Sequence, residues 1–211
     1  MPAATSVGKA KLDLLYRDAS ASAVSLIRYS KESKSYIDFG SGFVLYDDSI
    51  KTVILTSAEV FDEDEEDIIV CFSNGETKQA SVFVSDVSSI YTSLVVDSIG
   101  SSNPVVFSRT VARGELVFTV SRVLAEITRP GIYTGSVIHP RCVSVSTHSG
   151  KPVNKYDDLF ALSCPVAGPC GELQRPATMV RLIGAPVFNL KCEVVGVIER
   201  SSQNKKRWKS S

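Results

Sequence analysis

The chain has 211 residues, of which 44% are hydrophobic and 22% are charged, and its 23 basic and 23 acidic residues cancel to a formal net charge of zero. This composition is typical of a folded globular protein, long enough for one large domain or two small barrels. No run of about 20 apolar residues is present, so we expect no membrane span. The balanced charge gives no electrostatic reason to expect a nucleic-acid partner.

The beginning of the chain and its cysteines bear on the cellular compartment. Residues 1–30 lack the basic and then apolar pattern of a secretory signal. The five cysteines make an odd count, which favours free thiols over a disulfide framework. We therefore expect an intracellular protein, cytoplasmic or nuclear.

Along the chain, an N-terminal tail (1–19) comes first, in which Lys9–Asp18 has the spacing of one or two helical turns. Many short β-prone runs separated by turn residues follow, which is typical of an all-β barrel or sandwich. The expected strands are Ala23–Tyr29, Tyr36–Tyr46, Thr52–Thr56, Asp67–Phe72, Ala80–Ser85, Ser93–Asp97, Leu116–Val120, Tyr133–Ile138, Leu159–Ser163, Pro186–Phe188 and Glu193–Glu199.

Turn residues support this division into strands. Ser73–Glu76, with the sequence Ser-Asn-Gly-Glu, predicts a hairpin because Asn and Gly tolerate a positive φ. Asn189–Cys192 has the same place between the last two expected strands. Ser98–Asn103 is poor in strand formers, so we expect the linker between two halves of the protein to begin there.

Two neighbouring segments, Gly40–Val44 (Gly-Ser-Gly-Phe-Val) and Val53–Phe61 (Val-Ile-Leu-Thr-Ser-Ala-Glu-Val-Phe), carry a family resemblance. Together they resemble the first part of trypsin-like serine proteases of the Deg (high-temperature-requirement) type, in which the second segment holds the catalytic histidine. Glu59 occupies the histidine position. A carboxylate with an ordinary pKa of about 4.3 is a weak base toward a serine hydroxyl.

The family's catalytic aspartate begins an Asp-Leu-Ala-Val-Leu strand, which Tyr91–Val95 (Tyr-Thr-Ser-Leu-Val) resembles. Tyr91 therefore occupies the aspartate position. Tyrosine is uncharged at neutral pH and cannot stabilise an imidazolium. Asp86 and Asp97 are alternatives if the register slides, at the expense of the match to the apolar strand.

The nucleophile region of the family, Gly-Asn-Ser-Gly-Gly-Pro followed by a hairpin, resembles Arg181–Glu199. The match places Ile183 at the nucleophilic serine and Arg181 at the glycine whose backbone N–H helps to form the oxyanion hole. Isoleucine has no nucleophilic atom. The resemblance therefore implies a protease scaffold whose triad positions, Glu59, Tyr91 and Ile183, are all degenerate.

The fold implied by this resemblance is all-β, with two antiparallel six-stranded β-barrels packed side by side. We expect the first barrel over residues 20–103, the second over 104–202 and a basic C-terminal tail over 203–211.

A second resemblance concerns Gly168–Glu172, which is similar to the Gly-x-Cys-Gly-Gly motif of viral cysteine proteases of the same fold. Cys170 would then be the nucleophile. However, the hairpin that should follow begins only at Pro186. The two histidines, His139 and His148, lie in the second half of the chain, whereas the family's histidine comes from the first barrel. We therefore treat this as a minor alternative.

Three functions remain. The first is a catalytically inactive protease homologue whose inter-barrel cleft holds a peptide or protein partner. The second is an active serine-type endopeptidase of the Deg type with a non-standard catalytic set, using Ser144, Ser146 or Ser163. The third is a purely structural role. No cofactor or metal is expected, because the cysteines and histidines do not form the paired spacing of zinc sites.

Overall fold

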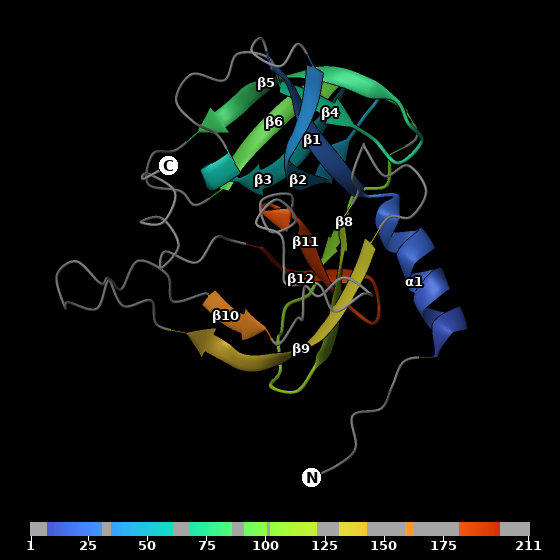
Figure 1. The fold of residues 1–211 in the computed structure, drawn as a ribbon, viewed down its shortest axis with the longest axis vertical. Helices are drawn as coiled ribbons and strands as arrows, with labels where there is room; N and C mark the ends of the chain where they lie inside the picture. Colours follow the sequence, from blue (N-terminus) through green and yellow to red (C-terminus); the bar gives the residue numbers. More distant parts are fainter. Residues whose placement is uncertain are drawn as a thin grey trace, which may run out of the picture.

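Two β-sheets and an N-terminal helix make up the described part of the computed structural model, which covers residues 8–30, 35–60, 68–85, 91–100, 102–121, 131–142, 159–162 and 182–198. Figure 1 shows one sheet above the other, with the helix beside them. We call the upper sheet the first barrel and the lower one the second sheet.

The first barrel is closed by six antiparallel strands in the order β1-β2-β3-β6-β5-β4, with β4 pairing back onto β1. It matches the expected first barrel in strand number and in the antiparallel pairing. Its strands are β1 (Ala23–Ser30), β2 (Ser35–Asp47), β3 (Lys51–Ser57), β4 (Ile68–Cys71), β5 (Thr77–Ser85) and β6 (Tyr91–Asp97).

Alternating side chains fill the interior of this barrel, because successive residues of a strand point to opposite faces. In β6, Thr92, Leu94 and Val96 are buried, whereas the residues between them are only half-buried. A single apolar cluster results. Its members are Val24, Leu26, Val44, Ile54, Val60, Ile68, Val70, Phe72, Ala80, Leu94, Val96 and Ile183.

The second sheet also has six strands, in the order β10-β9-β8-β11-β12-β7. Within the described residues it is open, and its β7–β12 pair is parallel. We expected a second closed antiparallel barrel, but the described residues form an open sheet with one parallel pair. The strands are β7 (Val106–Phe107), β8 (Leu116–Ser121), β9 (Gly131–Cys142), β10 (Leu159–Leu162), β11 (Pro186–Asn189) and β12 (Glu193–Val197).

All eleven expected strands are present with shifted ends, and β7 is the strand that the sequence did not predict. β7 has only two residues, and its position depends on pairing with β12. The amide of Ser108, the residue after β7, donates to the carbonyl of Val194 at 2.8 Å. The two predicted turns are confirmed between β4 and β5 and between β11 and β12. Gly75 has a φ of 87° and Cys192 a φ of 60°.

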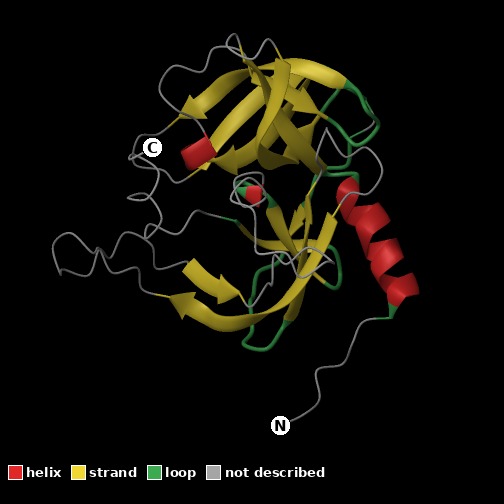
Figure 2. Cartoon of the chain, viewed as in Figure 1, coloured by secondary structure: helices red, strands yellow, loops and turns green. Residues whose placement is uncertain are grey.

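Helix α1 (Lys9–Ser20) is longer than the one or two turns expected within the N-terminal tail. The tertiary structure explains the difference. Leu15 and Ala19 are buried against Phe43 of the first barrel and against Phe118 and Phe188 of the second sheet. Figure 2 shows α1 alongside both sheets. Within the described ranges, no helix combines the length and apolar character that crossing a bilayer requires.

Candidate functional site

The histidine and aspartate positions lie at adjoining ends of two paired strands. Glu59 is in the short 3-10 helix η1 (Ala58–Val60), which begins directly after β3. Tyr91 is the first residue of β6 and lies opposite Ser57, the last residue of β3, in the antiparallel register. The backbone at the two positions is therefore separated by one short turn. The register thus places the backbone of η1 near the start of β6.

Of the two alternatives for the aspartate position, Asp97 and Asp86, the structure describes only Asp97. Asp97 is the last residue of β6 and pairs with Lys51, at the opposite end of the strand from Tyr91. It therefore lies away from η1. Asp86 is outside the described residues.

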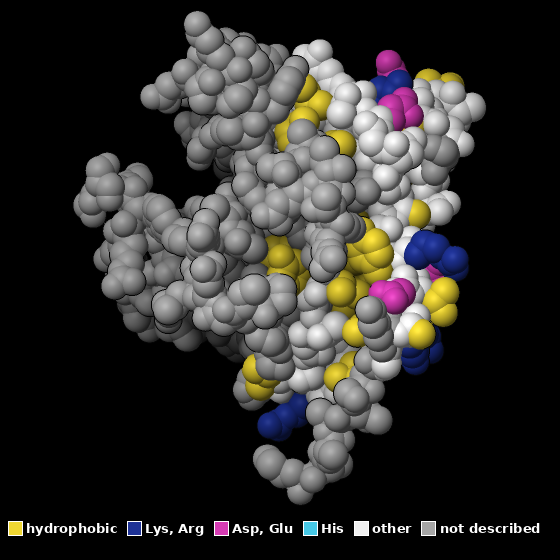
Figure 3. Space-filling model, turned by 45° about the vertical axis from the view of Figure 1, so that its right-hand side comes forward, with side chains coloured by type: hydrophobic (Ala, Val, Ile, Leu, Met, Phe, Trp, Pro, Cys, Tyr) yellow, Lys and Arg dark blue, Asp and Glu magenta, His cyan; other side chains and the backbone are white. Residues whose placement is uncertain are grey.

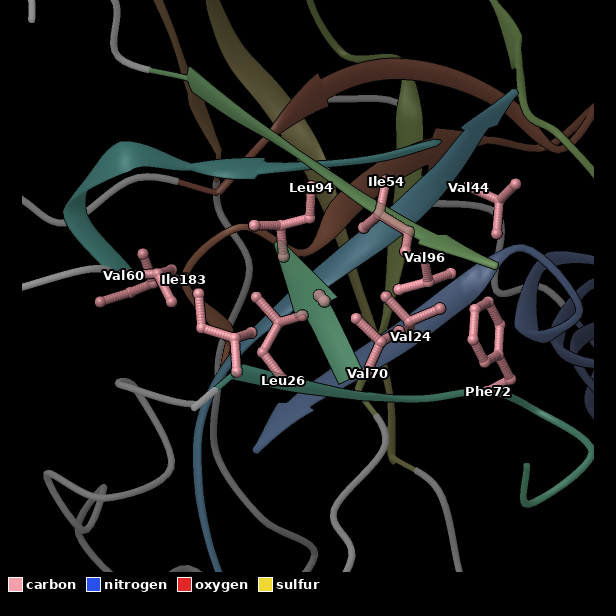
Figure 4. Close-up of a cluster of buried hydrophobic side chains, with 12 residues drawn as sticks. Val24, Leu26, Val44, Ile54, Val60, Val70, Phe72, Leu94, Val96 and Ile183 are labelled. Carbon is pink, nitrogen blue, oxygen red and sulfur yellow. The ribbon is translucent and has the colours of Figure 1, made fainter. Parts of the chain in front are cut away.

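The nucleophile position lies in a turn just before β11. Ile183 is only 5% exposed, and its side chain enters the core of the first barrel rather than that of the second sheet. Figure 4 shows Ile183 beside Val60 at one end of the cluster, with Phe72 at the other end. Because Val60 follows Glu59 directly, the nucleophile position lies next to the segment of the histidine position.

Gly184 explains how this turn approaches the first barrel so closely. Its φ is 83°, and a Cβ at this position would overlap with the carbonyl oxygen of Ser41 and with Oγ1 of Thr56. Thr56 Oγ1 also donates a hydrogen bond to Ser41 O at 2.7 Å. Only glycine combines this backbone conformation with the absence of a side chain.

Backbone hydrogen bonds fix the turn from both sides. The amide of Ser41 donates to the carbonyl of Ile183 at 2.9 Å, and the amide of Gly184 donates to the carbonyl of Ile198 at 2.9 Å. The turn is thus held by β2 of the first barrel and by the end of the β11–β12 hairpin. A turn attached to paired strands is positioned more precisely than an unsupported loop would be.

Sequence reasoning did not single out Thr56 and Val60 as residues of this site. Both are buried. Thr56 lies opposite Gly42 in the β2–β3 register, and Gly40 comes so close to Val60 that a Cβ there would be 2.7 Å from Val60 Cγ1. The signal was available: two glycines in one strand imply that other groups approach that strand closely.

The other candidate groups are only partly placed. Arg181, Ser144, Ser146, Ser163, His148, Cys164 and Cys170 lie outside the described residues. The backbones of His139 and Cys142 belong to β9, which is separated from β11 by β8. Among the described residues, no three His, Cys, Asp or Glu side chains gather as metal ligands would.

The groups at the three matched positions can be compared with what acyl transfer requires. The usual route requires a nucleophile, a base that takes its proton and a group that orients the base. A buried isoleucine supplies no nucleophile, and the half-buried Tyr91 supplies no carboxylate. The residues at these two matched positions therefore differ in chemical type from the serine and the aspartate of the family.

A closed six-stranded barrel beside a second six-stranded sheet, together with a match to a solved structure, gives the chain the trypsin-like, or chymotrypsin-type, protease fold. Among solved structures, the chain is similar to the protein Rv3671c from Mycobacterium tuberculosis H37Rv, in the inactive form of a serine-to-alanine mutant. The TM-score is 0.65 at 17% sequence identity, over 94% of this chain and 84% of the other. At this identity the likeness concerns the fold alone. No family model and no curated protein matches the sequence.

Proposed function

We propose that the protein is a catalytically inactive homologue of the Deg-type proteases, which holds a peptide or protein partner between the first barrel and the second sheet without cutting it. The observation that carries the proposal is the burial of Ile183 in the core of the first barrel. An apolar side chain at the nucleophile position faces away from any bound polypeptide. Loss of one triad member costs several orders of magnitude in rate.

The Deg-type assignment is supported by sequence motifs alone. Gly40–Val44 and Arg181–Glu199 keep the glycine, proline and hairpin residues of the family, while the residues that carry its chemistry differ. At each of the motif residues Gly40, Gly42 and Gly184, an added Cβ would lie under 3.0 Å from a neighbouring atom. They have a structural reason to be glycine whether or not the protein is an enzyme.

The partner is proposed by analogy with the fold, whose enzymes bind polypeptides where the two halves meet. A nucleic-acid partner has less support, because the charge is balanced. On the face shown in Figure 3, the described Lys and Arg side chains lie among Asp and Glu rather than in one basic field. A reducing, intracellular compartment is proposed from the odd number of cysteines in the sequence, and Cys192 is a free thiol.

Incubation of the purified full chain with fluorescein-labelled casein tests the proposal. A rise in fluorescence anisotropy with no release of acid-soluble fluorescence supports binding without cleavage. Fragment release at a rate proportional to protein concentration contradicts it and favours the active endopeptidase. An unchanged anisotropy contradicts the binding part and favours a structural role.

A further inference from the structure

One short segment of β2, Gly40–Val44, contacts several parts of the second half of the protein and the chain just after α1. We call this segment the joint. Its residues face alternately in opposite directions, as in any strand. Val44 belongs to the apolar cluster inside the first barrel, whereas Phe43 belongs to the cluster outside it.

The first link involves Ser41 and Gly40. Ser41 N donates to Ile183 O at 2.9 Å, and a Cβ on Gly40 would be 3.4 Å from the same oxygen. The side chain of Ile183 then completes the core of the first barrel. A residue that precedes a strand of the second sheet thus supplies part of the interior of the other unit.

The second link is Phe43, which is 0% exposed. It packs in one cluster with Phe118 and Phe188 of the second sheet and with Leu15 of α1. Its ring also meets that of Phe107 edge to face, with centroids 6.1 Å apart. A fully buried aromatic side chain of this kind contributes a large share of interface stability.

The third link is Val44. Its carbonyl accepts a hydrogen bond from Val105 N at 3.0 Å, just before β7, and its amide donates to Ser22 O at 2.8 Å, just after α1. The joint is therefore attached to the turn that contains Ile183, to the core of the second sheet, to the residue before β7 and to a residue just after α1.

We propose that the joint and Ile183 couple the first barrel to the second sheet so that the two open and unfold as one unit. Separating them would expose Phe43 and withdraw Ile183 from the barrel core, so a partner meets a fixed surface and not a hinge. This proposal does not depend on whether the protein is an enzyme.

Hydrogen exchange of the native full chain, followed by mass spectrometry, tests the coupling through a substitution on one side only. Val187 is buried in the second sheet, in a cluster that contains no first-barrel residue. Val187→Ala destabilises the second sheet directly. If the units are coupled, peptides from β1 and β6 exchange faster by the same factor as peptides from β8 and β12, at least about tenfold.

A second variant destabilises the first barrel instead of the second sheet. Ile183→Val removes one methylene from the first-barrel cluster. This change is mild enough to leave a folded protein even if Val187→Ala fails to fold. Coupling predicts an equal acceleration in β6 and β8. For either variant, faster exchange in one unit with unchanged exchange in the other overturns the proposal.

Discussion

Ile183 and Val60 lie side by side inside the first barrel, although one comes from the turn before β11 and the other from η1. In a protease of this fold the corresponding segments present a nucleophile and a base. Here Ile183 and Val60 both belong to the apolar cluster of the first barrel. Under the proposed function, the matched nucleophile position serves the stability of the protein.

Replacing Ile183 by serine, the family's nucleophile, should destabilise the protein rather than activate it. The change leaves a cavity and buries a hydroxyl group, at a cost of about 3 to 5 kcal/mol in the free energy of unfolding. Ile183→Val should cost about 1 kcal/mol. Urea denaturation of both variants measures the difference. A serine variant as stable as the parent would show that the side chain is not a core residue.

Gly184→Ala tests the close approach at the junction. The added Cβ meets Ser41 O and Thr56 Oγ1, and the φ of 83° adds strain. Together these effects should cost at least about 3 kcal/mol. The matched control is Gly75→Ala, at a φ of 87° with nothing within 4 Å of the added Cβ, which should cost about 1 to 2 kcal/mol. Equal losses in thermal unfolding would contradict the close approach.

The positions of the strands in the first half could be predicted in large part from the sequence, because period-2 burial and turn residues such as Gly75 are local signals. The extra length of α1 could not, since it depends on contacts of Leu15 and Ala19 with distant aromatic rings. The parallel pairing of β7 could not either, because two residues carry no periodicity.

The same division holds for the candidate site. Flanking motifs located Glu59, Tyr91 and Ile183, and the structure brings the first two together through the β3–β6 register. The direction of the Ile183 side chain was not predictable from a motif, because it depends on how the turn meets β2. Burial of a side chain in the core of another sheet is a tertiary property.

The carboxylate of Asp47 should make the free energy of unfolding fall at acidic pH. Burial raises its pKa, but hydrogen bonds from the hydroxyls of Ser102, Thr52 and Ser98 outweigh that effect and hold the pKa below its ordinary value of 3.8. A depressed folded pKa stabilises the protein above the unfolded pKa, and this contribution is lost as the pH falls through the folded pKa.

Asp47→Asn should therefore lower stability at pH 7 and flatten its decline between about pH 5 and pH 2. Ser98→Ala removes one of the donors and should reduce the effect only in part. Denaturant titrations over this pH range give the comparison. An unchanged slope in the Asp47 variant would show that these hydroxyls do not hold the carboxylate.

The thiol of Cys192 should react slowly. Burial raises its pKa, and the negative charge of Asp18 raises it further, so less thiolate is present near neutral pH. Iodoacetamide at pH 8 should alkylate Cys192 more slowly in the native protein than in urea, and Asp18→Asn should accelerate the native reaction. Peptide mass mapping follows the site. Equal native and denatured rates would contradict the burial.

The central claim is that a trypsin-like fold persists here without a working nucleophile. The most direct measurement is intact-mass analysis of the native full chain after incubation with a fluorophosphonate probe, with trypsin as the positive control. We predict no mass increase under conditions that label trypsin completely. A stoichiometric increase, abolished by prior denaturation and mapped to one serine, would contradict the claim.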